Sequence, residues 1–322
     1  MTIDIARERR TTSARWEDAL DAQLEAYLFT TSERGRRYLD GWVESSSTRS
    51  QKYGDAADKR YAKFLATGTA DIAAALFNAE PVHIDPDMMT LWESACDGFV
   101  EEPLHESDLL TDVGFVYLPR PHSITDIHET KTNHRAYLWV RINDGIVLFL
   151  LHQLGDVDGY DTGKGMQTPT VMRGYGALHR GDLIVDGMYP WKFGDSPQYR
   201  GTTAKGTPMT HDVQVLFRLL QQTITTRERG RPTRPVRRRM KHAGFPERNV
   251  VVVRLRRPTT PTGDGDAHSV EWSHRWLVEG HWRNQWFPSL GIHRQIRING
   301  YVKGPADLPL QVRKTRIFDW SR

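Results

Sequence analysis

The spacing of apolar residues changes its period near residue 112, and that change limits the folds available to this chain. Before this point, apolar side chains recur every three or four residues, which is the period of an amphipathic α-helix. The pattern predicts helices that begin after Ser13 and Ser32 and three more over residues 55–65, 70–77 and 87–100. The first hundred residues are therefore expected to be mainly helical.

After residue 112, short runs of branched and aromatic residues alternate with turn residues, as is typical of β-strands. Two such runs, 135–142 and 145–152, are separated by Asn143-Asp144 and predict a hairpin. Later strand-like runs cover 249–257, 270–286, 294–298 and 311–320. The predicted fold class is α+β, with an N-terminal helical region, a β-rich middle, a basic linker and a small C-terminal antiparallel β domain.

Composition and breaks in periodicity predict three regions. Residues 1–226 are expected to form an acidic domain, first helical and then β-rich, which ends in an amphipathic helix starting at Thr210. Residues 227–245 are expected to be a basic linker, because two prolines and a glycine interrupt the helical pattern there. Residues 246–322 are expected to form a small Trp-rich β domain.

Charge is divided unevenly between the two ends of the chain. Residues 227–322 hold 21 Lys and Arg against 8 Asp and Glu, a net charge of +13, whereas residues 1–226 hold 23 against 32, a net charge of −9. Such an asymmetry favours a polyanionic partner, most often nucleic acid. Most of the excess lies in 227–257, and three interpretations remain open for it: contact with DNA or RNA, docking on the protein's own acidic half, or a solvated linker.

The Trp-rich segment 272–286 offers a second candidate surface. On an extended strand Arg275, His281 and Arg283 share one face, opposite a face rich in tryptophan. That polar face suits nucleic-acid binding, metal-independent nuclease chemistry with His281 as general acid or base, or plain solvation over a Trp-rich core. The candidate nucleic-acid-binding residues are Arg237, Arg238, Arg239, Lys241, Arg254, Arg275, His281, Arg283, Arg294, Arg297 and Lys303.

Several other classes of site are not expected. Cys96 is the single cysteine, so it cannot form an internal disulfide, and its helical setting predicts a core thiol. His122, His128 and His134 would lie about 20 Å apart on a straight strand, too far for one metal ion, so surface or turn histidines are expected. We expect no metal and no cofactor. The N-terminus lacks a signal-peptide pattern and the apolar run 145–151 is too short to cross a bilayer, which predicts a cytoplasmic protein without a membrane partner.

Part of the C-terminal sequence resembles a known group of proteins. The string HRWLVEGHWRNQW at 274–286, followed by YVKGP at 301–305, resembles a segment of certain actinobacterial and actinophage proteins. The string YPWKFG at 189–194 is also similar to one in those chains. The group has no established activity, so the resemblance implies a setting on phage or mobile-element DNA and no catalytic role.

These observations give one leading hypothesis and two alternatives. The leading hypothesis is a nucleic-acid-binding protein of a phage or mobile element that acts through residues 227–245 and the C-terminal β domain. The first alternative is a metal-independent nuclease that uses His281 with Arg275 and Arg283. The second is a protein-interaction or inhibitor module with an acidic body, whose partner is a host or phage protein.

Overall fold

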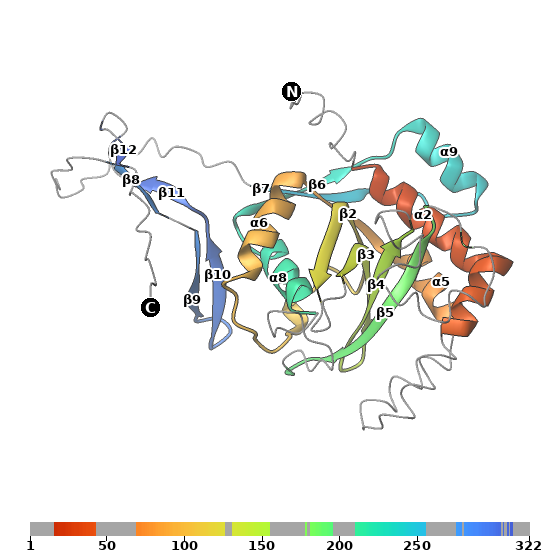
Figure 1. Ribbon diagram of the computed structural model, residues 1–322, viewed down its shortest axis with the longest axis horizontal. Helices are drawn as coiled ribbons and strands as arrows, with labels where there is room; N and C mark the ends of the chain where they lie inside the picture. Colours follow the sequence, from red (N-terminus) through yellow and green to blue (C-terminus); the bar gives the residue numbers. More distant parts are fainter. Residues whose placement is uncertain are drawn as a thin grey trace, which may run out of the picture.

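A computed structural model describes the fold of this chain (Figure 1). The described residues are 16–42, 69–125, 131–154, 178, 181–195, 210–255, 275–278, 280–303, 305, 308 and 310–311. The predicted fold class is confirmed: N-terminal helices, a central mixed sheet and a small C-terminal antiparallel sheet are all present. No helix in the described part of the chain is long and apolar enough to span a membrane.

A mixed sheet of seven strands forms the centre of the protein. Its strands are β1 (Glu80–Ile84), β2 (Val113–Thr125), β3 (Lys131–Ile142), β4 (Gly145–Gln153), β5 (Leu183–Lys192), β6 (Thr225–Gly230) and β7 (Val250–Leu255). They lie in the order β5-β4-β3-β2-β1-β7-β6, and only β1 runs parallel to its neighbours. Residues 143 and 144 form the turn between β3 and β4, so the predicted hairpin is confirmed.

Helices cover both faces of this sheet (Figure 1). On one face lie α2 (Asp18–Thr31), the helical segment 33–42, α5 (Thr69–Asn78) and α9 (Arg234–His242); on the other lie α6 (Pro86–Cys96) and α8 (His211–Leu220). The helices expected after Ser32 and over 70–77 are confirmed, and the one expected over 87–100 is present but ends at Cys96. The helix expected over 55–65 lies outside the described residues, as does Ser13.

Strand β4 explains why the core has two halves. Its apolar run is buried on both sides, as expected for a central strand. Val147, Phe149 and Leu151 pack against the α2 side, whereas Leu148 and Leu150 pack against the α6 and α8 side. The alternation of side chains along one strand therefore builds both halves of the core.

The predicted basic linker is corrected by the structure. Residues 225–230 form the edge strand β6, which pairs antiparallel with β7, and residues 234–242 form α9. Val236 and Met240 of α9 are 5% and 0% exposed and belong to the core. Strand β7, expected in the C-terminal domain, also belongs to the central sheet. The burial of two apolar side chains four residues apart fixes a helix where the prolines and the charge indicated a linker.

The C-terminal part forms small separate sheets. β9 (His281–Phe287) and β10 (Ile292–Ile298) make an antiparallel hairpin, and β8 (Arg275–Val278) pairs with β11 (Tyr301–Lys303) and β12 (Leu310–Gln311). Trp282 attaches the hairpin to the body: its Nε1 donates to the carbonyl of Ala95 at 2.8 Å, and its ring lies 5.0 Å from that of Phe99. The hairpin is thus docked on the end of α6.

Candidate nucleic-acid interface

Helix α9 holds its basic side chains on a rigid support. Pro235 lies in the first turn, where its missing N–H removes no intrahelical hydrogen bond. Val236 and Met240 then fall on one face of the helix and enter the core between α9, α2 and the sheet. Because this face is buried, the remaining positions of the helix must face outward or sideways.

Three cations share the outward face of α9. Arg234, Arg238 and Lys241 are spaced by four and three residues, which places them on the side opposite Val236 and Met240. All three are exposed, and none forms an ion pair with a residue that the structure describes. The helical rise separates Arg234 from Arg238 by about 6 Å along the axis. This face therefore presents three closely spaced positive charges that form no ion pair with a described residue.

A recess of about 410 Å³ opens beside this face. It is lined by Arg234, Arg237, Arg238, Lys241, Phe245 and Glu247. The one acidic residue of the lining, Glu247, lies 3.7 Å from Arg237, and both side chains are well exposed to solvent. Four cations against one carboxylate leave the recess positively charged. Arginine dominance favours bidentate contact with phosphate.

Other basic residues of this region form ion pairs, two of them with the acidic half of the chain and one within the basic segment itself. Arg239 forms an ion pair with Asp21 on α2. Burial, followed by the charge of Asp21, raises the pKa of the neighbouring Glu25 carboxyl, while Arg239 acts in the opposite direction. Arg229 lies 3.4 Å from Glu80 and Arg254 lies 2.8 Å from Glu228. The basic segment therefore docks on the body through some of its arginines and exposes the others.

The candidate residues of the C-terminal hairpin are divided in the same way. His281, Arg283 and Lys303 are exposed, and Arg283 donates to the side chain of Gln285 at 2.7 Å. Arg294 and Arg297 are largely buried instead: Arg294 lies 3.4 Å from Asp108, and Arg297 sits over the ring of Trp282 at 6.0 Å. The backbone of Arg275 is described, but its side chain lies outside the described residues.

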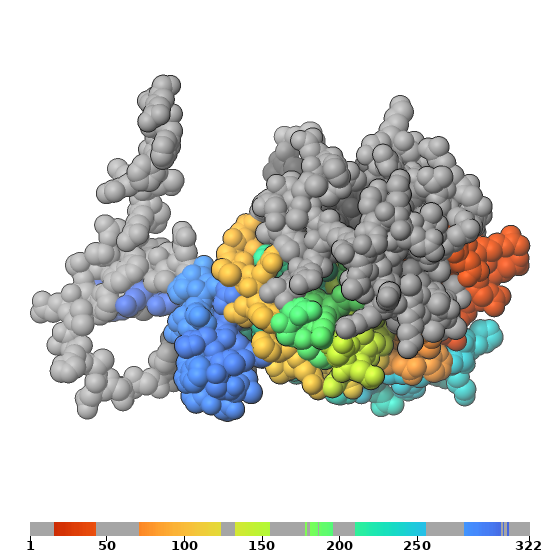
Figure 2. All heavy atoms as spheres, turned by 90° about the horizontal axis from the view of Figure 1, so that it is seen from below, coloured from red at the N-terminus to blue at the C-terminus, as the bar shows by residue number. Residues whose placement is uncertain are grey.

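The two predicted surfaces do not meet. In both Figure 1 and Figure 2, the blue β9–β10 hairpin and the cyan α9 lie on opposite sides of the body. The body formed by the central sheet separates them. A single continuous interface built from Arg238, Lys241, His281 and Arg283 is therefore not formed. In the part of the chain that the structure describes, α9 gathers three cations that form no ion pair.

A buried polar cluster that the sequence did not indicate joins β2, α6 and α8. Nε2 of His122 lies 2.8 Å from Oδ2 of Asp212, and its Nδ1 lies 3.7 Å from Oε1 of Glu93. The imidazole of His211 lies 3.1 Å from the other oxygen of Asp212. Arg120 forms an ion pair with Glu93. Two buried imidazoles and the partly exposed guanidinium of Arg120 thus surround two carboxylates.

Electrostatics within this cluster favour its charged forms. Burial opposes charge on His122, but hydrogen bonds to Asp212 and Glu93 raise its pKa overall. Burial also acts against the ionised Glu93, yet its bonds to His122 and Arg120 lower the pKa to about 2. The same balance lowers the pKa of Asp212 well below its ordinary range. His122 and His134, expected at the surface or in turns, are instead buried and lie opposite each other in the β2–β3 ladder.

Cys96 and the question of a metal site both bear on this cluster. Cys96 packs beside it, its thiol 3.2 Å from the carbonyl of Trp92, and burial raises the pKa of that thiol. Cys96 is partly buried and packs against the apolar core, where the sequence predicted a core thiol. Within the described residues, no group of three or more His, Cys, Asp or Glu side chains is arranged to hold a metal ion. The cluster therefore reads as an ion-pair network that joins secondary-structure elements.

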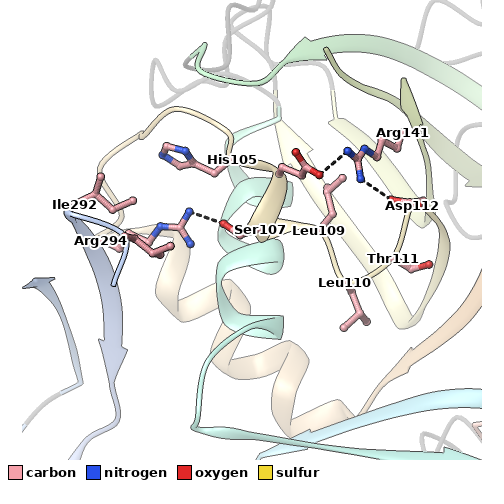
Figure 3. Close-up of a pocket in the computed structure, with 11 residues that line it drawn as sticks. His105, Ser107, Leu109, Leu110, Thr111, Asp112, Arg141, Ile292 and Arg294 are labelled. Carbon is pink, nitrogen blue, oxygen red and sulfur yellow. Dashed lines mark hydrogen bonds and ion pairs between the residues drawn. The ribbon is translucent and has the colours of Figure 1, made fainter. Parts of the chain in front are cut away.

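A second cavity, of about 900 Å³, lies between residues 105–112 and the hairpin (Figure 3). Arg294 reaches across it to donate to Oγ of Ser107 at 2.7 Å, and Arg141 pairs with Glu106 and Asp112 on the opposite wall. Both arginines in the lining are thus committed to partners. This distinguishes the cavity from the recess beside α9, where most cations are free of such partners.

Comparisons with known proteins add no relative. A scan against protein-family models, a search of curated proteins and a search of solved structures each find no match to this chain.

Proposed function

We propose that this protein binds nucleic acid through the exposed face of α9 and the recess beside it. The observation that carries the proposal is the alignment of Arg234, Arg238 and Lys241 on one exposed face whose opposite side is fixed in the core. A rigid row of unpaired cations can neutralise several phosphates at once and release their counterions. Preorganisation matters because flexible cations would lose side-chain and backbone entropy on binding.

The chemistry of the α9 surface favours contact with the phosphate backbone of a nucleic acid over contact with its bases. Its lining is dominated by arginine and lysine, and its one aromatic side chain, Phe245, is only 3% exposed. Phosphate contacts position a protein on nucleic acid but carry no sequence information. We therefore expect binding that depends weakly on sequence and strongly on salt.

The test is a binding titration of DNA and RNA oligonucleotides against wild-type protein and two triple variants. The first variant, Arg234→Ala with Arg238→Ala and Lys241→Ala, is expected to lose most of the affinity, at least tenfold at moderate salt. The matched control, Arg36→Ala with Arg37→Ala and Lys192→Ala, also removes three exposed cations, none of them a candidate binding residue. It is expected to change affinity much less. Equal losses in both variants would show a nonspecific charge effect and contradict the proposal.

The two alternatives give different outcomes in the same experiment. A nuclease would release product in the presence of chelator, and His281→Ala would stop it. A protein-interaction module would show no shift with any nucleic acid and a stable complex with a protein partner. His281 is exposed and lies two residues from Arg283 on β9, so it is accessible for such a test.

A further inference from the structure

One edge of the β9–β10 hairpin is closed by the body of the protein. The backbone N–H of Gln295 donates to Oε1 of Glu102 at 3.2 Å, and that of Arg297 donates to Oε1 of Gln222 at 2.8 Å. These N–H groups therefore point away from β9 and toward the body. Two side chains from the body satisfy the outer edge of β10, where another strand would otherwise pair.

The register of the hairpin then fixes which groups of β9 face outward. Because the N–H groups of residues 295 and 297 point away from β9, these two residues exchange no backbone hydrogen bonds with it. The hydrogen-bonded pairs of this antiparallel ladder are therefore the alternate ones, which include Arg283 and Gln285 of β9. The backbone groups of Trp282, Asn284 and Trp286 consequently point to the other side. Figure 1 shows β10 between β9 and the body, so this side faces away from the body.

These outward groups of β9 are largely unpaired. No described residue accepts a hydrogen bond from the backbone N–H groups of Trp282, Asn284 and Trp286. The carbonyl of Trp286 accepts only from the side chain of its neighbour Gln285, at 3.0 Å. The ring of Trp286 is 44% exposed, although it is a large apolar side chain. An unpaired edge with an exposed tryptophan is a site for strand addition.

The sequence of β9 fits a second copy of itself. An antiparallel pair centred on Asn284 places Trp282 opposite Trp286 of the partner subunit and Arg283 opposite Gln285 of the partner subunit. Aromatic cross-strand pairs stabilise a sheet, and no like charges face each other in this arrangement. Residues 280–303 contain no Asp or Glu, so no carboxylate would be desolvated when the edges meet. A two-fold contact is also the commonest symmetry of homo-oligomers.

We propose that β9 pairs antiparallel with β9 of a second copy of this chain, centred on Asn284, to form a four-stranded intermolecular sheet. The pairing gives the outward N–H groups their acceptors and covers Trp286. In this register Asn284 faces Asn284 of the partner subunit as a hydrogen-bonded pair, with Cα atoms about 5.5 Å apart.

Molar mass measured by light scattering during size-exclusion chromatography, without nucleic acid, tests the proposal. Wild type is expected to be dimeric at micromolar concentration. Asn284→Pro removes an N–H that β10 does not use, so the hairpin is retained and the dimer is lost. Asn284→Ala keeps that N–H and is expected to remain dimeric. Circular dichroism reports whether each variant is folded.

A disulfide experiment covers the case in which the proline variant does not fold. Asn284→Cys is expected to form a covalent dimer under mild oxidation, because its Cα separation lies within the disulfide range. Ser289→Cys, in the hairpin turn, lies roughly 30 Å from its counterpart in this register and is expected to stay uncoupled. A monomer at all concentrations, or a dimer in which Asn284→Cys does not couple, would overturn the proposal. Either result leaves the α9 interface untouched.

Discussion

Nε2 of His122 lies 2.8 Å from Oδ2 of Asp212, and this pair joins β2 to α8 inside the protein. The two residues are 90 positions apart in sequence. His211 binds the second oxygen of the same carboxylate and also lies 3.2 Å from the carbonyl of Phe99. One carboxylate thereby holds together β2, α8 and the segment that supports the C-terminal hairpin.

This cluster predicts a pH-dependent stability. Buried His122 and His211 both have raised pKa values because hydrogen bonds to Asp212 outweigh burial. Their contribution is therefore fully present below the unfolded pKa of about 6.5 and declines as pH rises through the folded values. The lowered pKa of Asp212 adds stability that is lost only in strong acid. We expect the Tm of wild type, relative to that of His122→Gln, to decrease as the pH rises above about 6.5, the unfolded value of the pKa.

The same variant should be costly near pH 6. Removing one partner of a buried ion pair destabilises by roughly 3–5 kcal/mol. Arg37→Gln is the matched control, because Arg37 pairs with Glu33 at 2.5 Å on an exposed helix surface. It should cost less than about 1 kcal/mol. Urea unfolding of both variants measures the difference, and parallel Tm–pH curves for wild type and His122→Gln would contradict this account of the cluster.

Helix α9 should contribute to global stability, in contrast to a linker. Met240 is 0% exposed, so Met240→Ala is expected to cost about 2–5 kcal/mol. The adjacent exposed Lys241→Ala should stay within about 0.5 kcal/mol. Denaturant midpoints compare the two. If Met240→Ala leaves the midpoint unchanged, residues 234–242 are not packed on the core.

Trp282 should hold the hairpin on the body. Trp282→Ala removes the hydrogen bond to Ala95 and the contact with Phe99, so we expect the hairpin to separate from α6. Leu290→Ala, in the hairpin turn where the side chain is 51% exposed, is the control. Limited proteolysis followed by mass spectrometry should show faster cleavage near residues 281–298 in the first variant alone. Equal cleavage of both variants would mean that Trp282 is not the anchor.

Local sequence patterns were sufficient to predict many of the helices and strands. The hairpin at Asn143-Asp144 and the helices over 70–77 and 87–100 follow from periodicity and turn residues, which act over a few neighbours. Strand β1 was missed, because five residues that include Pro81 give too little alternation to identify a strand. Its place between β2 and β7 is set by long-range pairing.

The sequence indicated which basic segment is a candidate site, but not how its side chains are arranged in space. Charge alone singled out the basic run in the sequence, yet only burial of Val236 and Met240 determines that Arg238 and Lys241 face solvent while Arg239 turns toward α2. Arg234 was not among the predicted binding residues, although its spacing of four from Arg238 could have indicated it. The cluster around Asp212 had no local signal, since tertiary packing alone brings its members together.

The salt dependence of binding tests the central proposal most directly. For duplex DNA, log Kobs falls with log salt by about 0.9 per phosphate contact. Removing Arg234, Arg238 and Lys241 together should therefore reduce the magnitude of that slope by roughly 2 to 3, while Arg36→Ala with Arg37→Ala and Lys192→Ala should leave it nearly unchanged. An identical slope in wild type and the α9 variant, or no salt-dependent binding in wild type, would contradict nucleic-acid binding through α9.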